Sequence, residues 1–306
     1  MPNAQNTVRL TDRPWFNKLL LLSVALMWGL SFTSMKGLVS ELPVFYLLAV
    51  RNGIATVAML LVVRENMLRH SDRQTIGLGI ILGLTCFGAY APQTIGLSMT
   101  TPGKNAFLTA CYCVMVPFFS WWFGRERPAL RHVLAAIVCV CGIGLVALDS
   151  GLPLNTGDLL SLLCGVSYAL QIVALDKWGS GKDMMVATTW QMIVMTVLST
   201  VTSLIVDPGY VPPVPTASDI ANLLFLGLVC SCFCYGGFNH AMARVDPTAG
   251  AILSAMEAPF GVLASVLLYH EQVTVKLLVG FALIFVSVVA SEVDLSSLKP
   301  LKRQET

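Results

Sequence analysis

Two charged side chains stand inside long apolar stretches of this sequence. Arg51 lies within residues 43–63 and Glu257 within residues 249–269. If these stretches are membrane helices, each charge costs about 2.5–3.5 kcal/mol to insert near the centre and is expected to face a cavity or a partner. At a rise of about 1.5 Å per residue, both lie about 12–15 Å deep in a core about 30 Å thick. We expect the two side chains to share one level of a buried site.

The chemistry of this pair suits a substrate that carries both charges. An arginine guanidinium can donate two parallel hydrogen bonds to a carboxylate. A buried glutamate can attract an ammonium group or take up a coupling proton. Arg51 and Glu257 therefore predict binding of a zwitterion such as an amino acid. The alternative is a structural ion pair that joins two helices.

Further polar and aromatic side chains recur inside the apolar stretches. In the first stretch, Trp28, Ser31 and Phe32 share one helix face through their i, i+3, i+4 spacing. A single aromatic residue suits packing or an interfacial anchor equally well, but the whole set indicates an amphipathic cavity lined by rings. The predicted cavity residues are Trp28, Arg51, Asn52, Tyr90, Gln93, Tyr112, Tyr168, Gln171, Trp190, Gln191, Tyr235, Asn239 and Glu257.

The sequence gives little support for nucleotide hydrolysis, metal binding or nucleic-acid binding. The sequence has no phosphate-binding G-x-x-x-x-G-K-[ST] loop and no H-E-x-x-H zinc motif. The nine cysteines fall inside apolar stretches, where they suit packing better than metal binding or disulfides. A net charge of +2 implies no nucleic-acid partner. We expect a protein that is not an enzyme, with no catalytic residues, no metal and no cofactor.

The elements that position these residues follow from the composition. Hydrophobic residues make up 56% of the chain and charged residues 12%, and the mean hydropathy is +0.74, which indicates a membrane protein. A membrane helix needs about 20 apolar residues. The sequence holds ten such stretches, at residues 18–37, 43–63, 75–97, 104–123, 131–149, 158–176, 186–206, 218–241, 249–269 and 275–292. The first is long enough to span and no cleavage site follows it, so we expect a retained helix and not a signal peptide.

The distribution of basic residues predicts the orientation. Lysine and arginine favour the cytoplasmic side of a membrane. If the N-terminus lies inside, fifteen of the nineteen basic residues fall on inner segments and only Lys36, Lys104 and Lys276 fall on outer ends. The same bias favours ten spans over nine or eleven. We therefore expect both termini to be cytoplasmic.

The sequence also repeats itself. The pattern LMWGLSF at residues 26–32 returns as LLCGVSY at residues 162–168. At offsets of 140 and then 145 residues the register continues, and it pairs Arg51 with Gln191, Thr56 with Thr196 and Tyr90 with Tyr235. Because each copy holds five spans, the second copy crosses the membrane in the opposite sense. Inverted repeats of this kind are typical of secondary transporters.

The motifs in this order resemble the drug/metabolite transporter superfamily, EamA type. They are LMWGLSFTSMKG, PVFYLLAVRNG, TTPGKNAFLTACYCVMVPFFSWWFGRERP and PTAGAILSAMEAPFGVLASVLLYHE, and the resemblance covers essentially the whole chain. It implies an all-α membrane protein of ten transmembrane helices, arranged as two inverted five-helix repeats around a central cavity, with the fifth and tenth helices at the periphery. The repeats are expected at residues 1–149, with a cytoplasmic head, and 150–306, with a cytoplasmic tail.

The resemblance implies a secondary transporter that moves a small amphipathic metabolite, such as an amino acid, by alternating access. Export is the expected direction, through the bacterial inner membrane, with proton coupling and a homodimer as open alternatives. A membrane receptor or scaffold with the same fold is the second hypothesis. Glu126 and Glu271 lie at equivalent ends of the fourth and ninth spans and are candidates for gating, although surface carboxylates are usually only solvated.

Overall fold

The computed structural model describes residues 13–124, 127–148, 155–245, 250, 253–270 and 274–292, and all regular structure among them is helical. Six helical segments are long and apolar enough to cross a membrane. They are α1 (Pro14–Val39), α2 (Val44–His70), α3 (Arg73–Met99), α7 (Thr156–Trp178), α8 (Met184–Val206) and the continuous run of α9 (Ala217–Leu224), η2 (Phe225–Phe233) and α10 (Cys234–Met242). The all-helical fold class is confirmed.

The remaining apolar stretches form shorter helices. They are α4 (Pro102–Ala110), α5 (Tyr112–Trp122), α6 (Leu130–Leu148), α12 (Glu257–Tyr269) and α13 (Val275–Glu292). Each one falls within or close to a stretch that the hydropathy of the sequence predicts to cross the membrane. The order of helices along the chain therefore follows the order of the ten expected spans.

Local sequence signals explain where several helices begin. Asp72 and Asp183 precede α3 and α8, and each side chain accepts hydrogen bonds from the backbone amides of the first turn. Asn155 precedes α7 in a capping box with Asp158, in which each side chain accepts from the other residue's backbone amide. These caps satisfy amides that have no partner inside the helix.

Three of the expected spans are interrupted near their middle. Span four breaks at Cys111, between α4 and α5, where ψ is −14°. Span nine turns at Met256, just before α12, where ψ is −13°. Span eight loosens into the π-helix η2, a rare geometry that often marks functional sites. All three interruptions lie next to residues that line the pocket described below or support its lining side chains.

Small residues let the helices approach closely. A Cβ atom added at Gly29 of α1 would lie 2.6 Å from the Cβ atom of Phe260 on α12. One added at Gly96 of α3 would lie 2.7 Å from the carbonyl oxygen of Gly157 on α7. Helix association inside membranes depends on such close packing. These contacts join α1 to α12 and α3 to α7, two of the main helix pairs of the bundle.

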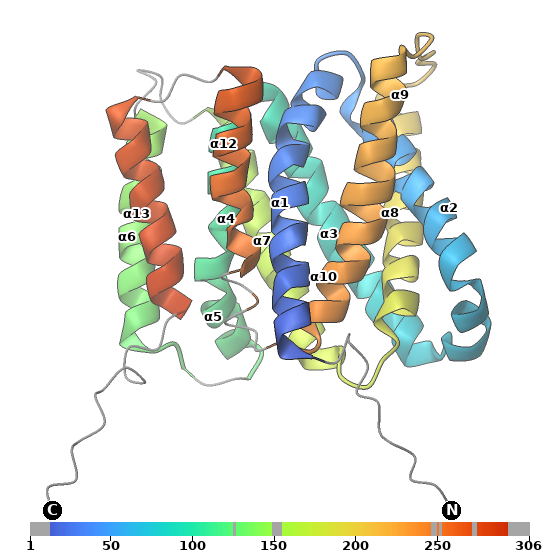
Figure 1. The fold of residues 1–306 in the computed structure, drawn as a ribbon, viewed down its shortest axis with the longest axis horizontal. Helices are drawn as coiled ribbons and strands as arrows, with labels where there is room; N and C mark the ends of the chain where they lie inside the picture. The colour runs from blue at the N-terminus through green and yellow to red at the C-terminus, as the bar shows by residue number, and fades with distance from the viewer. Residues whose placement is uncertain are drawn as a thin grey trace, which may run out of the picture.

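The helices run up and down in alternation (Figure 1). In the view of Figure 1, α1 starts at the lower end and α7 starts at the upper end, so the two run in opposite directions. The helices α6 and α13 pack against each other at the left edge, while α2 packs against α8 on the other side. The pair of α6 and α13 therefore lies at the periphery, and the other helices surround the interior.

The outer surface of the bundle is apolar. Leu61 and Val62 on α2 are each 75% exposed, and Leu204 and Ile205 on α8 are 70% and 72% exposed. Leu278 on the peripheral helix α13 is also exposed. Apolar surface on this scale indicates contact with lipid.

Candidate functional site

A pocket opens between the helices near the middle of the bundle. Side chains from α1, α2, α3, α5, α7, α10 and α12 line it, and the space between them is about 630 Å³ when the open solvent at its mouth is counted. The lining residues are Trp28, Ser31, Phe32, Met35, Arg51, Tyr90, Gln93, Thr94, Leu97, Tyr112, Tyr168, Gln171, Ile172, Tyr235, Phe238 and Glu257. The pocket thus draws residues from both halves of the chain.

Arg51 on α2 is almost fully buried beside the pocket. Its Nε donates to the hydroxyl of Ser231 at 2.7 Å, and its Nη2 donates to the hydroxyl of Tyr90 at 2.8 Å. Its Nη1 contacts the Met35 sulfur at 3.8 Å. The Tyr90 ring centre also lies 4.7 Å from the guanidinium carbon, close enough for a cation–π interaction. Neutral groups therefore hold this cation in place.

The π-helix η2 supplies part of this support. Ser231, which accepts from Arg51, lies within η2. The carbonyl oxygen of Cys230, one residue earlier, accepts a hydrogen bond of 2.9 Å from the indole nitrogen of Trp28. A π-helix bonds its backbone from residue i to residue i+5 and is frequent at functional sites. Two residues of η2 therefore position two lining side chains.

Glu257 lies at the first position of α12 and is 5% exposed. The side chain of Tyr112 hydrogen-bonds to it. Tyr112 itself follows the break at Cys111, so two helix interruptions bring these two residues together. Arg51 and Glu257 line the same pocket, but among the described residues they form no ion pair with each other. The pocket therefore holds a buried cation and a buried acid that are separately bound.

Aromatic rings line the pocket as a connected series. Ring centres lie 5.1 Å apart for Trp28 and Tyr235, and 5.9 Å apart for Tyr235 and Tyr90. Tyr168 continues the series, 6.3 Å from Tyr90 and 5.9 Å from Tyr112. These separations are typical of favourable aromatic pairs. Successive rings come alternately from the first and the second half of the chain.

Two carboxamides in the pocket differ in their bonding. Gln93 donates to the hydroxyl of Thr109 at 3.2 Å and accepts from the hydroxyl of Tyr168 at 3.3 Å. Gln171 has no partner for either end of its side chain among the described residues. Gln93 is therefore held by the protein, whereas Gln171 lines the pocket without a hydrogen bond to the described residues.

Nine of the thirteen predicted cavity residues line this pocket, and four lie elsewhere. Asn52 donates to Ser199 between α2 and α8, and Asn239 donates to Gln191 between α10 and α8. Trp190 reaches Ser71 near the end of α2. A sequence pattern shows that a residue is polar inside a helix, but it does not distinguish a face that lines a pocket from one that joins a neighbouring helix.

Several lining residues carry no polar signal and were not predicted. Met35, Leu97, Ile172 and Phe238 are apolar, and Thr94 is only weakly polar. Met35 follows Trp28, Ser31 and Phe32 at the i+7 position of the same helix face. Helical spacing could have found Met35, but the other apolar residues look like ordinary packing residues in the sequence.

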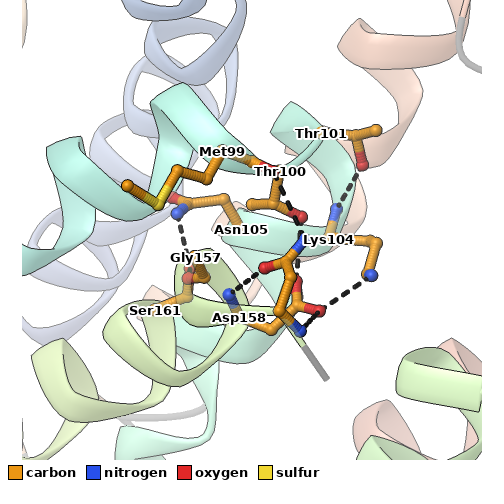
Figure 2. A network of polar contacts seen from close by, with 9 residues as sticks. Met99, Thr100, Thr101, Lys104, Asn105, Gly157, Asp158 and Ser161 are labelled. Carbon is orange, nitrogen blue, oxygen red and sulfur yellow. Dashed lines mark hydrogen bonds and ion pairs between the residues drawn. The ribbon is translucent and has the colours of Figure 1, made fainter. Parts of the chain in front are cut away.

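A second buried polar group, which we call the Asp158 cluster, joins α4 to α7 at the upper end of the view in Figure 1 (Figure 2). Lys104, expected on an outer end, is 8% exposed and forms a 3.0 Å ion pair with Asp158. Thr100 donates to the same carboxylate at 2.9 Å, and Asn105 donates to Ser161 at 2.7 Å. The cluster comprises Thr100, Lys104, Asn105, Asn155, Asp158 and Ser161. The two candidates for gating, Glu126 and Glu271, lie outside the described residues.

Comparisons with known proteins agree with this architecture. A solved structure shares the fold, with a TM-score of 0.69 over 94% of this chain and 100% of the other, at 16% identity. An uncharacterised transporter of Archaeoglobus fulgidus is 25% identical over 87% of this chain and 82% of its own length. The uncharacterised transporter YvbV of Bacillus subtilis is 26% identical, covering 88% and 89% of the two chains.

A protein named as a biotin transporter in Escherichia coli is 23% identical, covering 83% of this chain and 85% of its own. The model of the EamA-like transporter family matches twice, at residues 15–148 and 155–291. The two matches cover nearly the whole described chain, and they agree with the apolar surface of a multi-pass membrane protein. The chain belongs to the EamA-like transporter family.

Proposed function

We propose that this protein is a secondary transporter that moves a small amphipathic metabolite, an amino acid or a related compound, outward by alternating access. The observation that carries the proposal is the pocket itself. It holds Arg51 and Glu257, both buried, and it is lined by rings from both halves of the chain. Two halves that share one binding site can expose it to either side by moving against each other.

The contacts between the halves support an inverted repeat. Under the register of the sequence, Thr56 is equivalent to Thr196, and their hydroxyls lie 2.8 Å apart. Residues 145 positions apart also meet in two further pairs, one of Tyr90 with Tyr235 and one of Tyr112 with Glu257. In a pair of halves related by a two-fold axis, a residue near the axis contacts its own equivalent. Such an axis would run through the pocket.

The orientation of the protein in the membrane and the coupling of transport to protons are part of the proposal. We place both termini in the cytoplasm of a bacterial cell, with the bundle in the inner membrane, because lysine and arginine crowd the segments on that side. In a variant without the native cysteines, of which Cys141 is exposed, a thiol reagent should label Ser71→Cys only from the cytoplasm and Val214→Cys only from outside, and reversed labelling would overturn the orientation. Glu257 is the candidate for proton coupling, since it is the buried acid of the pocket.

Counterflow in proteoliposomes tests the function. Purified protein is reconstituted, the vesicles are loaded with one unlabelled compound of a panel, and uptake of the labelled compound is measured. The panel holds the common amino acids and, because one relative is named as a biotin transporter, also biotin. We expect counterflow of at least one compound that carries a carboxylate. Saturable binding without counterflow of any compound would favour a receptor or scaffold.

A further inference from the structure

Gln171 on α7 is 1% exposed and lines the pocket. Neither its amide nitrogen nor its amide oxygen has a hydrogen-bond partner in the described part of the chain. Three buried carboxamides outside the pocket, Asn52, Gln191 and Asn239, each leave one end unpaired but bond through the other. A buried polar group without a partner is unfavourable, and Gln171 is the carboxamide among the described residues that lacks a partner at both ends and lines the pocket, where a substrate group can supply one.

We propose that Gln171 binds a neutral amide-type group of the substrate, a urea, lactam or carboxamide, while Arg51 binds its carboxylate. This assignment rests on the proposed function, because it names the substrate class of the same pocket. In the proposed function, Arg51 and Glu257 bind two charged groups of the substrate. Gln171 would bind a third group, which is neutral. Gln171 is then the residue that selects among compounds with a carboxylate.

The chemistry of a carboxamide defines the group that it recognises. Its oxygen accepts hydrogen bonds and its nitrogen donates two, all in one plane. A urea, a lactam or a second carboxamide offers a donor and an acceptor side by side and satisfies both ends of Gln171. An ammonium group satisfies only the oxygen, and a carboxylate satisfies only the nitrogen. A substrate with a planar, neutral group therefore fits this side chain best.

The surroundings of Gln171 in the pocket suit such a group. The ring of Tyr168, three residues before Gln171 on α7, contacts the rings of Tyr90 and Tyr112, and all three rings line the pocket together with Gln171. Planar amide-type groups stack well on such rings. Gln93, the other carboxamide of the pocket, is bonded at both ends to protein hydroxyls, so it does not compete with Gln171 for the substrate.

Arg51 retains donors for the carboxylate. A guanidinium has five N–H groups, and the partners of Arg51 are the hydroxyls of Ser231 and Tyr90 and the weakly accepting sulfur of Met35. No carboxylate among the described residues forms an ion pair with it. An anionic group of the substrate would supply the missing counter-charge.

Binding of matched ligand pairs to the purified full-length protein tests the assignment. One pair is L-citrulline, which carries a urea, and L-norleucine, which carries an alkyl chain. The other is a pentanoate with a terminal imidazolidinone ring and a pentanoate with a terminal cyclopentane ring. In at least one pair, we expect the wild-type protein to bind the urea compound about ten- to a hundredfold more tightly.

The variant Gln171→Leu should bring the two affinities of that pair close to equal. The control Gln191→Leu changes a carboxamide outside the pocket and should preserve the ratio. If Gln171→Leu does not fold, Gln171→Met keeps the unbranched shape of the side chain and replaces it. Loss of the ratio in Gln191→Leu as well would show a general effect on the bundle and overturn the assignment.

The assignment is also overturned if neither urea compound binds, if no pair is discriminated, or if Gln171→Leu retains the ratio. These outcomes differ from a failure of the proposed function, because binding in detergent does not require transport. Discrimination without any counterflow would sustain the role of Gln171 and contradict transport. Counterflow without discrimination within the ligand pairs would support transport and contradict the role of Gln171.

Discussion

The pocket and the Asp158 cluster are both buried and polar, but their polar groups are bonded differently. In the Asp158 cluster, the carboxylate of Asp158 is met by the ammonium of Lys104 and the hydroxyl of Thr100 (Figure 2). In the pocket, Gln171 lacks any partner among the described residues and Arg51 lacks a counter-charge. Each side chain of the cluster bonds to the protein through at least one atom, although Oδ1 of Asn105 has no partner among the described residues. The bonding in the cluster is that of a contact between helices, and the bonding in the pocket is that expected of a binding site.

This difference separates two uses of polar residues inside a membrane protein. Side chains that satisfy one another tie helices together. Side chains that the protein leaves unsatisfied on the wall of a pocket are candidates for contact with a ligand. The hydrogen bonds of a polar residue, more than its depth, therefore indicate its role.

The largest expected effect lies in the Asp158 cluster. Lys104→Met removes one partner of a buried ion pair and leaves Asp158 without its counter-charge, which costs about 3–5 kcal/mol. We expect a marked loss of folded protein, measured by size-exclusion chromatography after extraction in detergent. The double variant Lys104→Met, Asp158→Leu should recover much of the yield. A normal yield for Lys104→Met would contradict the structural role of the cluster.

An intermediate effect is expected where α1 packs on the pocket wall. Gly29→Ala places a Cβ atom 2.6 Å from Phe260 and 2.9 Å from the backbone nitrogen of Gly261, and such overpacking costs about 1–3 kcal/mol. At Gly165 the nearest atoms are 3.4 Å from an added Cβ, so Gly165→Ala should be tolerated. Thermal unfolding in detergent compares the two variants. Equal losses of stability would show that the packing of α1 on α12 is looser than the structure indicates.

The smallest effect distinguishes the two glutamines of the pocket. Gln93→Leu breaks two hydrogen bonds to protein hydroxyls and should lower stability by about 1 kcal/mol per bond. Gln171→Leu breaks none with the described residues, so the unfolding temperature should stay the same or rise. The unfolding temperatures of both variants are measured in detergent without added ligand. A larger loss for Gln171→Leu than for Gln93→Leu would mean that Gln171 has a structural partner.

Much of the architecture could be predicted because it depends on hydrophobicity. The all-helical fold, the order of the helices and the presence of Arg51 and Glu257 at one pocket follow from long apolar stretches interrupted by costly charges. The family also followed from the order of the motifs, and the match of the family model confirmed it.

The details of the site depend on contacts between residues that are far apart in the chain, and the sequence does not show which residues meet. Lys104 looked like a surface cation, because nothing in the sequence indicates that the start of α4 meets Asp158 on α7. Gln191 and Gln171 look equivalent as buried carboxamides, yet one lies between two helices and the other lines the pocket. The π-helix η2 has no clear sequence signal, although it supports Arg51 through Ser231.

The most direct test of the central claim is transport and folded yield for Arg51→Gln, Glu257→Gln and the double variant. The measurement is counterflow of a compound that the wild-type protein exchanges, together with the amount of monodisperse protein. Because the two side chains bond to different partners and not to each other, we expect each single variant to lose at least about tenfold in transport, as loss of a charged hydrogen bond predicts. The double variant, in which both side chains are neutral, should not recover transport. Recovery of transport and yield in the double variant would contradict the account, because it would show that the two residues form a structural pair.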